Sequence, residues 1–135
     1  MTDKRSSDRH LALRVVMMPR DTNPHGTIFG GVLLSYLDQA GAVGAYQAIR
    51  QSGFSKKSLV TVGMKSVEFH RPVFVGDVVS FWTKIIRFGT TSVTIHVEVE
   101  AERDGQPEKL TEAEVSYVAF TMQGDKRVPV PISDR

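Results

Sequence analysis

Residues 28–49 read IFGGVLLSYLDQAGAVGAYQAI. The stretch is too long for a strand and rich in leucine and alanine, so it predicts one long helix that begins near residues 30–31 and ends near 50–53. Because the helix is apolar on nearly every side, we expect it to be buried on nearly every side. Glycines inside it, such as Gly41 and Gly44, each cost about 1 kcal/mol relative to alanine. Their presence indicates a close approach by another part of the chain.

The other apolar segments of the chain predict strands. In the clearest of them, residues 93–100, valine and isoleucine alternate with polar residues, as in a strand with one buried face. The expected strands are 10–18, 59–69, 77–88, 90–102 and 109–122. The order is therefore one strand, the helix, and four strands in meander order. This order predicts an α+β fold, an antiparallel sheet of five to six strands wrapped around one central helix.

Length and composition limit the class of protein. The 135 residues, 41% hydrophobic and 24% charged, predict one domain over 1–135, with flexible tails at 1–9 and about 128–135. A net charge of +2 and the lack of a basic–aromatic run argue against nucleic acid as a partner. No secretory signal or membrane span is recognisable, so a cytoplasmic protein is expected. The absence of cysteine excludes disulfides, thiolate nucleophiles and cysteine-ligated metals.

Asp38 is the only charged residue between Asp21 and Arg50. A carboxylate in a low-dielectric core costs several kcal/mol unless it is paired or hydrogen-bonded. Small or polar residues lie three or four positions apart along the same face of the helix: Gly31, Ser35, Ala42 and Ala45. From the residue pattern alone, Asp38 is a solvated helix residue, a structural carboxylate satisfied by a neighbouring chain, or a catalytic group.

The loop before the helix, residues 21–31, reads DTNPHGTIFGG. A helix N-terminus presents unpaired N–H groups and a partial positive charge, and glycines at positions 30 and 31 let a ligand oxygen reach them. Asn23 and His25 bring hydrogen-bonding side chains into the same neighbourhood, although Asn23 equally suits an Asx turn and His25 a surface position. The four histidines show no metal-binding spacing, so no metal site is predicted.

Residues 21–45, DTNPHGTIFGGVLLSYLDQAGAVGA, resemble the signature of the hotdog-fold acyl-coenzyme A thioesterases, above all the short single-domain bacterial acyl-CoA hydrolases. The matching positions are Asp21, Thr22, Asn23, Gly26, Phe29, Gly30, Gly31 and Asp38. Residues 60–79 and 89–100 are similar to the family's strands in the same order. The resemblance implies the hotdog fold and hydrolysis of acyl-CoA to a free acid and coenzyme A, with no cofactor.

The resemblance also implies roles for individual residues. Asp38 would activate a water as general base, or attack the thioester as a nucleophile. The N–H of Gly31 would polarise the thioester carbonyl, Asn23 would orient the water or the acyl carbonyl, and Thr61 would position water. The family further implies a homodimer with active sites between subunits, Asn23 of one chain facing Asp38 of the other, and a trimer of dimers.

Several residues are candidates for holding the substrate. Around the acyl thioester these are His25, Phe29 and Gly30. For the phosphates of coenzyme A the candidates are the cations Lys65, Arg71, Lys84 and Arg87, with Lys56 and Lys57 as further ones, and the main-chain N–H groups of Gly89, Thr90, Thr91 and Ser92.

Two other functions remain as alternatives. A non-catalytic acyl-CoA-sensing module on the same fold would be expected to lack Asp38 or Asn23, and both are present. A hotdog enoyl-CoA hydratase would need an aspartate and a histidine at a set spacing, and the spacing from Asp21 to His25 is one residue too short. His25 also departs from many bacterial thioesterases, which have asparagine at that position.

Overall fold

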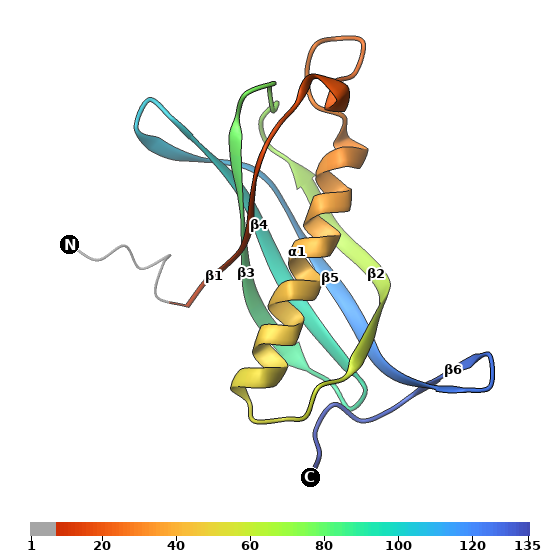
Figure 1. Ribbon diagram of the computed structural model, residues 1–135. Helices are drawn as coiled ribbons and strands as arrows, with labels where there is room; N and C mark the ends of the chain where they lie inside the picture. Colours follow the sequence, from red (N-terminus) through yellow and green to blue (C-terminus); the bar gives the residue numbers. More distant parts are fainter. Residues whose placement is uncertain (1–7) are drawn as a thin grey trace.

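The computed structural model describes residues 8–135, and in it one long helix lies across one face of an antiparallel sheet (Figure 1). The helix α1 spans Gly30–Gln51, and one turn of 3-10 helix, η2, spans Pro19–Asp21. The strands are β1 (His10–Val16), β2 (Ser58–Phe69), β3 (Val78–Phe88), β4 (Ser92–Arg103), β5 (Gln106–Gln123) and β6 (Lys126–Pro129). The expected helix, the five expected strands and the antiparallel α+β architecture are confirmed.

The order of strands in the sheet is β1-β3-β4-β5-β2, with β6 paired to β5. The expected meander is right for β3, β4 and β5 but wrong for β2, which pairs with β5. A turn at Asp104–Gly105, where both residues have positive φ, closes β4 and β5 into a hairpin. In contrast, residues 70–77 form a longer connection from β2 to β3. Since β1 takes the edge of β3 that a meander would give to β2, β2 lies at the opposite edge.

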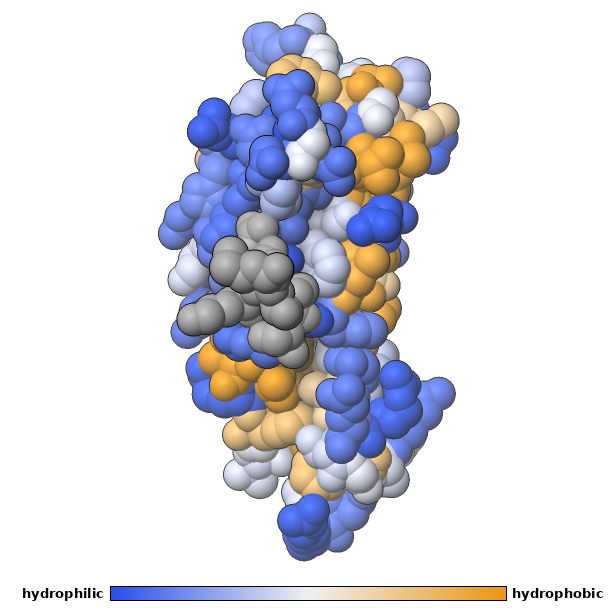
Figure 2. Space-filling model, turned by 90° about the vertical axis from the view of Figure 1, so that its left-hand side faces the viewer, coloured by the Kyte–Doolittle hydropathy of each residue, from blue (hydrophilic) through white to orange (hydrophobic). Residues whose placement is uncertain are grey.

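The helix α1 buries only the face that lies on the sheet. The buried helix residues are Leu33, Leu37, Ala40, Gly41, Gly44, Ala45, Ala48 and Ile49. The opposite face exposes Ser35, Gln39 and Val43. Burial on nearly every side is therefore wrong for the single chain, because one sheet covers only one side of a helix. Figure 2 shows exposed hydrophobic residues along the right-hand edge of the molecule and in a second group at the lower left. No helix within residues 8–135 combines the length and hydropathy needed to cross a bilayer.

The helix glycines lie where strand side chains meet the helix backbone. A Cβ at Gly41 would collide with the hydroxyl of Tyr117 on β5, and a Cβ at Gly44 would lie 2.5 Å from Oγ1 of Thr83 on β3. Both contacts are much closer than van der Waals distance. The close approach predicted from the glycines is confirmed, and it draws α1 tightly onto the centre of the sheet.

Gly41→Ala is expected to destabilise the fold even though alanine is the better helix former. Overpacking against Tyr117 costs more than the helix propensity gains, so the free energy of unfolding should fall by about 1–3 kcal/mol. Urea denaturation measures this loss. Gly31→Ala is the matched control, because apart from the adjoining residues and the backbone of the helix itself no atom of the described residues lies within 4 Å of a Cβ at Gly31. A Gly41→Ala protein with the wild-type urea midpoint would contradict the close packing.

The two expected tails differ in outcome. Residues 1–7 lie outside the described residues, whereas Asp8 pairs with Lys84 on β3 at 2.9 Å. Near the other end, the expected flexible tail at 128–135 is corrected. Its first residues belong to β6, Ile132 is fully buried in the core, and the Asp134 carboxylate lies 2.6 Å from Nζ of Lys57. Apolar burial and ion pairing hold this segment, which two prolines had suggested to be irregular.

The Asp134 contact predicts a pH-dependent stability. Hydrogen bonds from Lys57 and Ser55 lower the pKa of Asp134 to about 2, from an ordinary value of 3.8. Because the folded pKa is the lower one, this stabilisation is present above pH 4 and is lost as the pH falls towards 2. Asp134→Asn should therefore melt at a lower temperature than wild type at pH 7, and the difference should vanish near pH 2. A difference independent of pH would contradict the pairing, and Asp125→Asn in the exposed β5–β6 turn is the control.

Candidate active site

Asp38 lies in the middle of α1, and side chains from two strands of the sheet contact it. Its Oδ1 accepts a hydrogen bond from Thr61 Oγ1 on β2 at 2.8 Å. The hydroxyl of Tyr117 on β5 lies 2.7 Å from the main-chain oxygen of Asp38 and 3.2 Å from Oδ1. The structure thus brings together two of the residues predicted from sequence, Asp38 and Thr61, and adds a third. Their catalytic roles stay predictions.

The register of the sheet explains this meeting. Thr61 and Tyr117 are direct partners across the β2–β5 pair, so their side chains emerge on the same face, under α1. The register shifts between Thr61 and Gly63, and such a bulge turns the strand locally. Two positions that are 56 residues apart in the sequence are therefore directed at one carboxylate of the helix.

The carboxylate of Asp38 has one oxygen bound and one open. Both hydroxyl donors bind Oδ1, and within residues 8–135 no donor and no Lys or Arg nitrogen contacts Oδ2. Burial, reinforced by the Asp38 charge and the hydrogen bond to it, raises the pKa of Tyr117 far above its ordinary value of 10.0. Tyr117 is therefore a protonated donor at every working pH. The arrangement leaves Oδ2 able to accept a proton from a water or a substrate group.

Asn23 shapes its own loop in this chain. Its Oδ1 accepts hydrogen bonds from the main-chain N–H of His25 at 2.9 Å and of Thr27 at 3.2 Å, and its Nδ2 donates to Thr27 Oγ1 at 2.8 Å. These contacts match the Asx-turn interpretation. His25 is exposed. The orienting role of Asn23 towards a water or an acyl carbonyl remains a prediction.

The start of α1 presents two open main-chain donors. Phe29 is the N-cap and gives no side-chain hydrogen bond. In the described part of the chain, no acceptor meets the N–H of Gly30 or Gly31, as expected for the first turn of a helix. The ring of Phe69 lies 3.3 Å from where a Cβ of Gly30 would be, whereas Gly31 is exposed. Gly31 therefore offers the more accessible donor for an anion or a carbonyl oxygen.

The single chain does not gather the predicted coenzyme A residues. Lys65 on β2 lies 3.5 Å from Glu114, Arg71 lies 3.4 Å from Glu108, and Arg87 is exposed near the end of β3. Lys84 is on β3, separated from β2 by two strands, which is about 14 Å. These cations can therefore meet one substrate only through more than one chain or a long substrate.

In the turn at residues 89–92, not every main-chain N–H group is free to bind a phosphate. The N–H of Gly89 donates to the main-chain oxygen of Ser92 at 2.8 Å, so it is not available to a phosphate. The main-chain oxygens of Thr90 and Thr91 accept hydrogen bonds from Ile132 and Ala119. Within the chain the N–H of Gly89 is therefore occupied, and phosphate binding by the N–H groups of Thr90, Thr91 and Ser92 stays a prediction.

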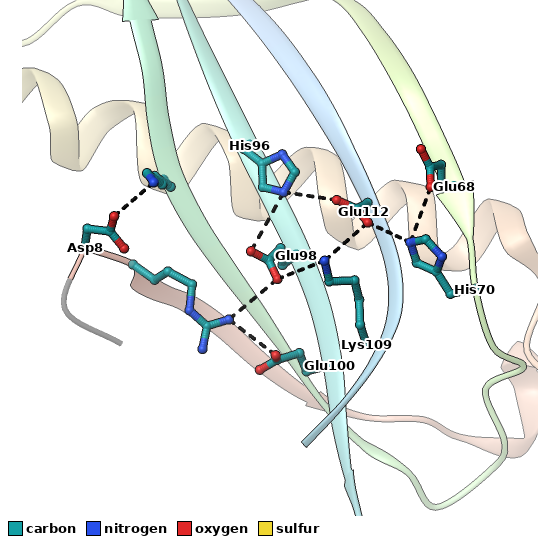
Figure 3. A network of polar contacts seen from close by, with 10 residues as sticks. Asp8, Glu68, His70, His96, Glu98, Glu100, Lys109 and Glu112 are labelled. Atoms are coloured by element: carbon teal, nitrogen blue, oxygen red, sulfur yellow. Dashed lines mark hydrogen bonds and ion pairs between the residues drawn. The ribbon is translucent and has the colours of Figure 1, made fainter. Parts of the chain in front are cut away.

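A network of charged side chains covers the outer face of the sheet, away from α1 (Figure 3). His96 lies 3.4 Å from Glu112 and 3.9 Å from Glu98, so it is part of this network. Burial opposes the charge of Glu112, but His70 and Lys109 hold the pKa of this carboxyl below its ordinary value. Glu68, His70 and Glu112 place three ligand atoms within 4.8 Å of one another. An ammonium group, that of Lys109 at 3.4 Å, already neutralises Glu112, so the network is an ion-pair surface.

Tyr117 is the site residue that sequence reasoning missed. Its signal was present, because it lies in phase with Val115 and Ala119 on the buried face of an alternating strand. A buried tyrosine hydroxyl requires a hydrogen-bond partner. The partner lies 79 residues away on α1, so only the sheet register reveals that it is Asp38.

Comparisons with known proteins identify the family of the chain. The pattern of the thioesterase superfamily matches residues 25–108. Acyl-CoA thioester hydrolase YciA of Salmonella typhimurium is 41% identical over 127 residues, 90% of each chain, and YciA of Escherichia coli is 42% identical over 122 residues, 87% of this chain and 88% of that one. Among solved structures, the hexameric hotdog-fold thioesterase Cj0915 of Campylobacter jejuni has a TM-score of 0.74 at 41% identity, covering 89% of each chain. The hexameric broad-specificity acyl-coenzyme A thioesterase HI0827 has a TM-score of 0.76 at 33% identity, covering 97% of this chain and 88% of that one.

Proposed function

Because the chain belongs to the thioesterase superfamily, we propose that it hydrolyses acyl-coenzyme A thioesters to a free carboxylic acid and coenzyme A. The observation that carries the proposal is the Asp38 carboxylate, held at Oδ1 by Thr61 and Tyr117 and open at Oδ2. A carboxylate in this state can take a proton from water. A thioester needs no stronger nucleophile, since its carbonyl carbon is electrophilic and a thiolate is a good leaving group.

The proposed mechanism uses water, one carboxylate and one helix terminus. Water attacks the carbonyl carbon while Asp38 Oδ2 takes its proton, and the carbonyl oxygen becomes an oxyanion. The N–H of Gly31, at the positive end of the helix dipole, stabilises that oxyanion. When the carbonyl re-forms, the C–S bond breaks, and the leaving thiolate takes the proton from Asp38. Direct attack by Asp38 through an anhydride is the second route, and the two hydroxyls that anchor the carboxylate make it the less favoured one.

Two copies of the chain are needed to build this site. Gly31 and Asp38 are seven residues apart on one helix, which places them about 10 Å apart along its axis. A base and an oxyanion donor must both lie within a few ångströms of the same carbonyl group. The Gly31 N–H of one subunit therefore acts with the Asp38 of its partner. Asn23, seven residues before Gly30 in the same chain, would then lie with Gly31, across the interface from Asp38.

The proposed assembly is a homodimer, and three dimers then form a hexamer. Strand β2 is an edge of the sheet, and its side chains Val62 and Phe69 are 59% and 54% exposed. A long apolar edge strand invites pairing with another strand, and a second copy of β2 supplies one. On α1, Val43 is 41% exposed and Gly31 is exposed as well. The hexameric thioesterases of similar structure support this assembly.

The substrate-binding residues belong to the same proposal. His25, Phe29 and Gly30, which lie in the loop before α1 and at its first residue, would contact the acyl thioester. Lys65, Arg71, Lys84 and Arg87, drawn from both chains, would neutralise the phosphates of coenzyme A. A cytoplasmic location is also proposed. The polyanionic substrate does not cross a bilayer, so enzyme and substrate must share a compartment.

Thiol release tests the proposed function. Purified protein is mixed with short-, medium-, long-chain and aromatic acyl-CoA in the presence of a thiol-reactive dye. The chain contains no cysteine, so the protein gives no background in this assay. We expect release of one thiol per thioester consumed. Absence of thiol release with every substrate would contradict the proposal, and tight binding without release would favour the sensing module instead.

A further inference from the structure

We infer that Tyr117 is a positioning residue for the reaction, the group that decides which oxygen of Asp38 acts as the base. The inference rests on the proposed thioester hydrolysis. Tyr117 is 1% exposed, and its ring fills the core beneath α1. Its hydroxyl is the only polar group of the side chain, and this hydroxyl lies at Asp38, the only charged residue of α1 before Arg50.

The contacts of Tyr117 join the backbone and the side chain of one residue. The hydroxyl lies 2.7 Å from the main-chain oxygen of Asp38 and 3.2 Å from its Oδ1. A hydroxyl has one proton to donate and shares it between the two acceptors. Holding both ends of the residue from below restricts rotation of its side chain. Together with the 2.8 Å bond from Thr61, this commits Oδ1 to the two hydroxyls and leaves Oδ2 as the oxygen without a hydrogen bond among the described residues.

A glycine of α1 leaves room for the Tyr117 hydroxyl. Gly41, three residues after Asp38, is the one glycine at which a Cβ would collide with the Tyr117 hydroxyl, and that Cβ would also lie 3.1 Å from Cζ of the ring. A glycine in a helix interior is unfavourable by about 1 kcal/mol. The chain accepts that penalty where it brings a phenol against Asp38. A purely space-filling side chain at 117 would need no polar group there.

Tyr117 and Thr61 are not equivalent. Thr61 is on the edge strand β2 and is exposed in the single chain, whereas Tyr117 is on the interior strand β5. Burial raises the pKa of Tyr117, so it remains a donor throughout the pH range of an assay. Of the two hydroxyl donors to Oδ1, Tyr117 is therefore the one held more rigidly. It touches Asp38 and acts on the substrate only through it.

Tyr117→Phe removes the hydroxyl and keeps the ring. We expect kcat to fall by about 10- to 100-fold through misplacement of the base, with KM changed by less than about twofold. Loss of a donor to the carboxylate should also move the acid side of the kcat pH profile to higher pH. Tyr46→Phe is the matched control, since Tyr46 is a half-buried tyrosine on α1 whose hydroxyl makes no hydrogen bond within residues 8–135. It should leave kcat and the pH profile unchanged.

The same substitution in an Asp38→Asn protein distinguishes positioning of the base from packing of the Tyr117 ring. In an Asp38→Asn protein there is no base to position, so adding Tyr117→Phe should lower the residual rate by less than about twofold. If Tyr117 acted through packing alone, Tyr117→Phe would lower the rate by the same factor in the wild-type and the Asp38→Asn proteins. If too little folded Tyr117→Phe is obtained, 3,5-difluorotyrosine at 117 keeps the ring and makes the hydroxyl a stronger donor, and the acid limb should then move to lower pH.

Two results would overturn the inference. One is a folded Tyr117→Phe enzyme with wild-type kcat and pH profile, and the other is an equal loss in the presence and absence of Asp38. Either outcome leaves the proposed function intact, provided the wild-type protein releases thiol. Failure of the wild-type protein itself would instead reject the proposed function.

Discussion

Asp38→Asn is expected to lower kcat by about 1,000-fold or more, because it removes the carboxylate that is proposed to accept a proton from water. Asparagine has nearly the same shape as aspartate, and its amide oxygen can still accept the hydrogen bonds from Thr61 and Tyr117. The melting temperature and the oligomeric state should therefore stay close to those of the wild type. Thiol release measures the rate, and size-exclusion chromatography with thermal melting checks the fold.

The control for Asp38→Asn makes the same chemical change elsewhere. Asp125→Asn alters an exposed aspartate in the turn between β5 and β6, and it should leave kcat within about twofold of the wild type. An Asp38→Asn enzyme with wild-type turnover would mean that Asp38 is structural. The base would then have to come from another residue.

Gly31→Pro is expected to have the second largest effect. Proline lacks the N–H that is proposed to stabilise the oxyanion, yet it is tolerated in the first turn of a helix. Removal of one such donor lowers kcat by about 100- to 1,000-fold. The expected result is a folded protein that has lost most of its turnover at saturating substrate, measured by thiol release across the acyl-CoA panel.

Gly31→Ala distinguishes the lost donor from added bulk. Alanine adds a Cβ and keeps the N–H, and apart from the adjoining residues and the backbone of the helix itself a Cβ at this position meets no described atom within 4 Å. Its turnover should therefore be much closer to that of the wild type. If alanine and proline reduce kcat equally, the side chain blocks the site and the main-chain donor is not responsible.

The sequence predicted the features that depend on local chemistry. The apolar run with an isolated charge predicted α1 and singled out Asp38, and the interior glycines predicted close packing that Tyr117 and Thr83 supply. The alternation of residues 93–100 predicted β4 and its buried face. In each case the information lies within one turn of helix or a few residues of strand, so it can be read without knowing the partner.

Features that depend on long-range pairing were missed. The place of β2 beside β5 follows from β1 taking the edge of β3, and no residue within β2 encodes that choice. Thr61 meets Asp38 only through this pairing, because β5 places it alongside Tyr117, which already contacts Asp38. The C-terminal segment was taken for a tail because of its prolines, although Ile132 fills the core and Asp134 pairs with Lys57.

The most direct test of the central claim mixes the two inactive variants in one oligomer. Gly31→Pro and Asp38→Asn chains with different tags are co-expressed, and mixed oligomers are isolated through both tags. If each site takes Gly31 from one subunit and Asp38 from its partner, about a quarter of the sites in randomly assorted oligomers keep both groups intact. Thiol release should then recover to about a quarter of the wild-type rate per site. Mixed oligomers as inactive as their parents would contradict a catalytic site shared between two chains.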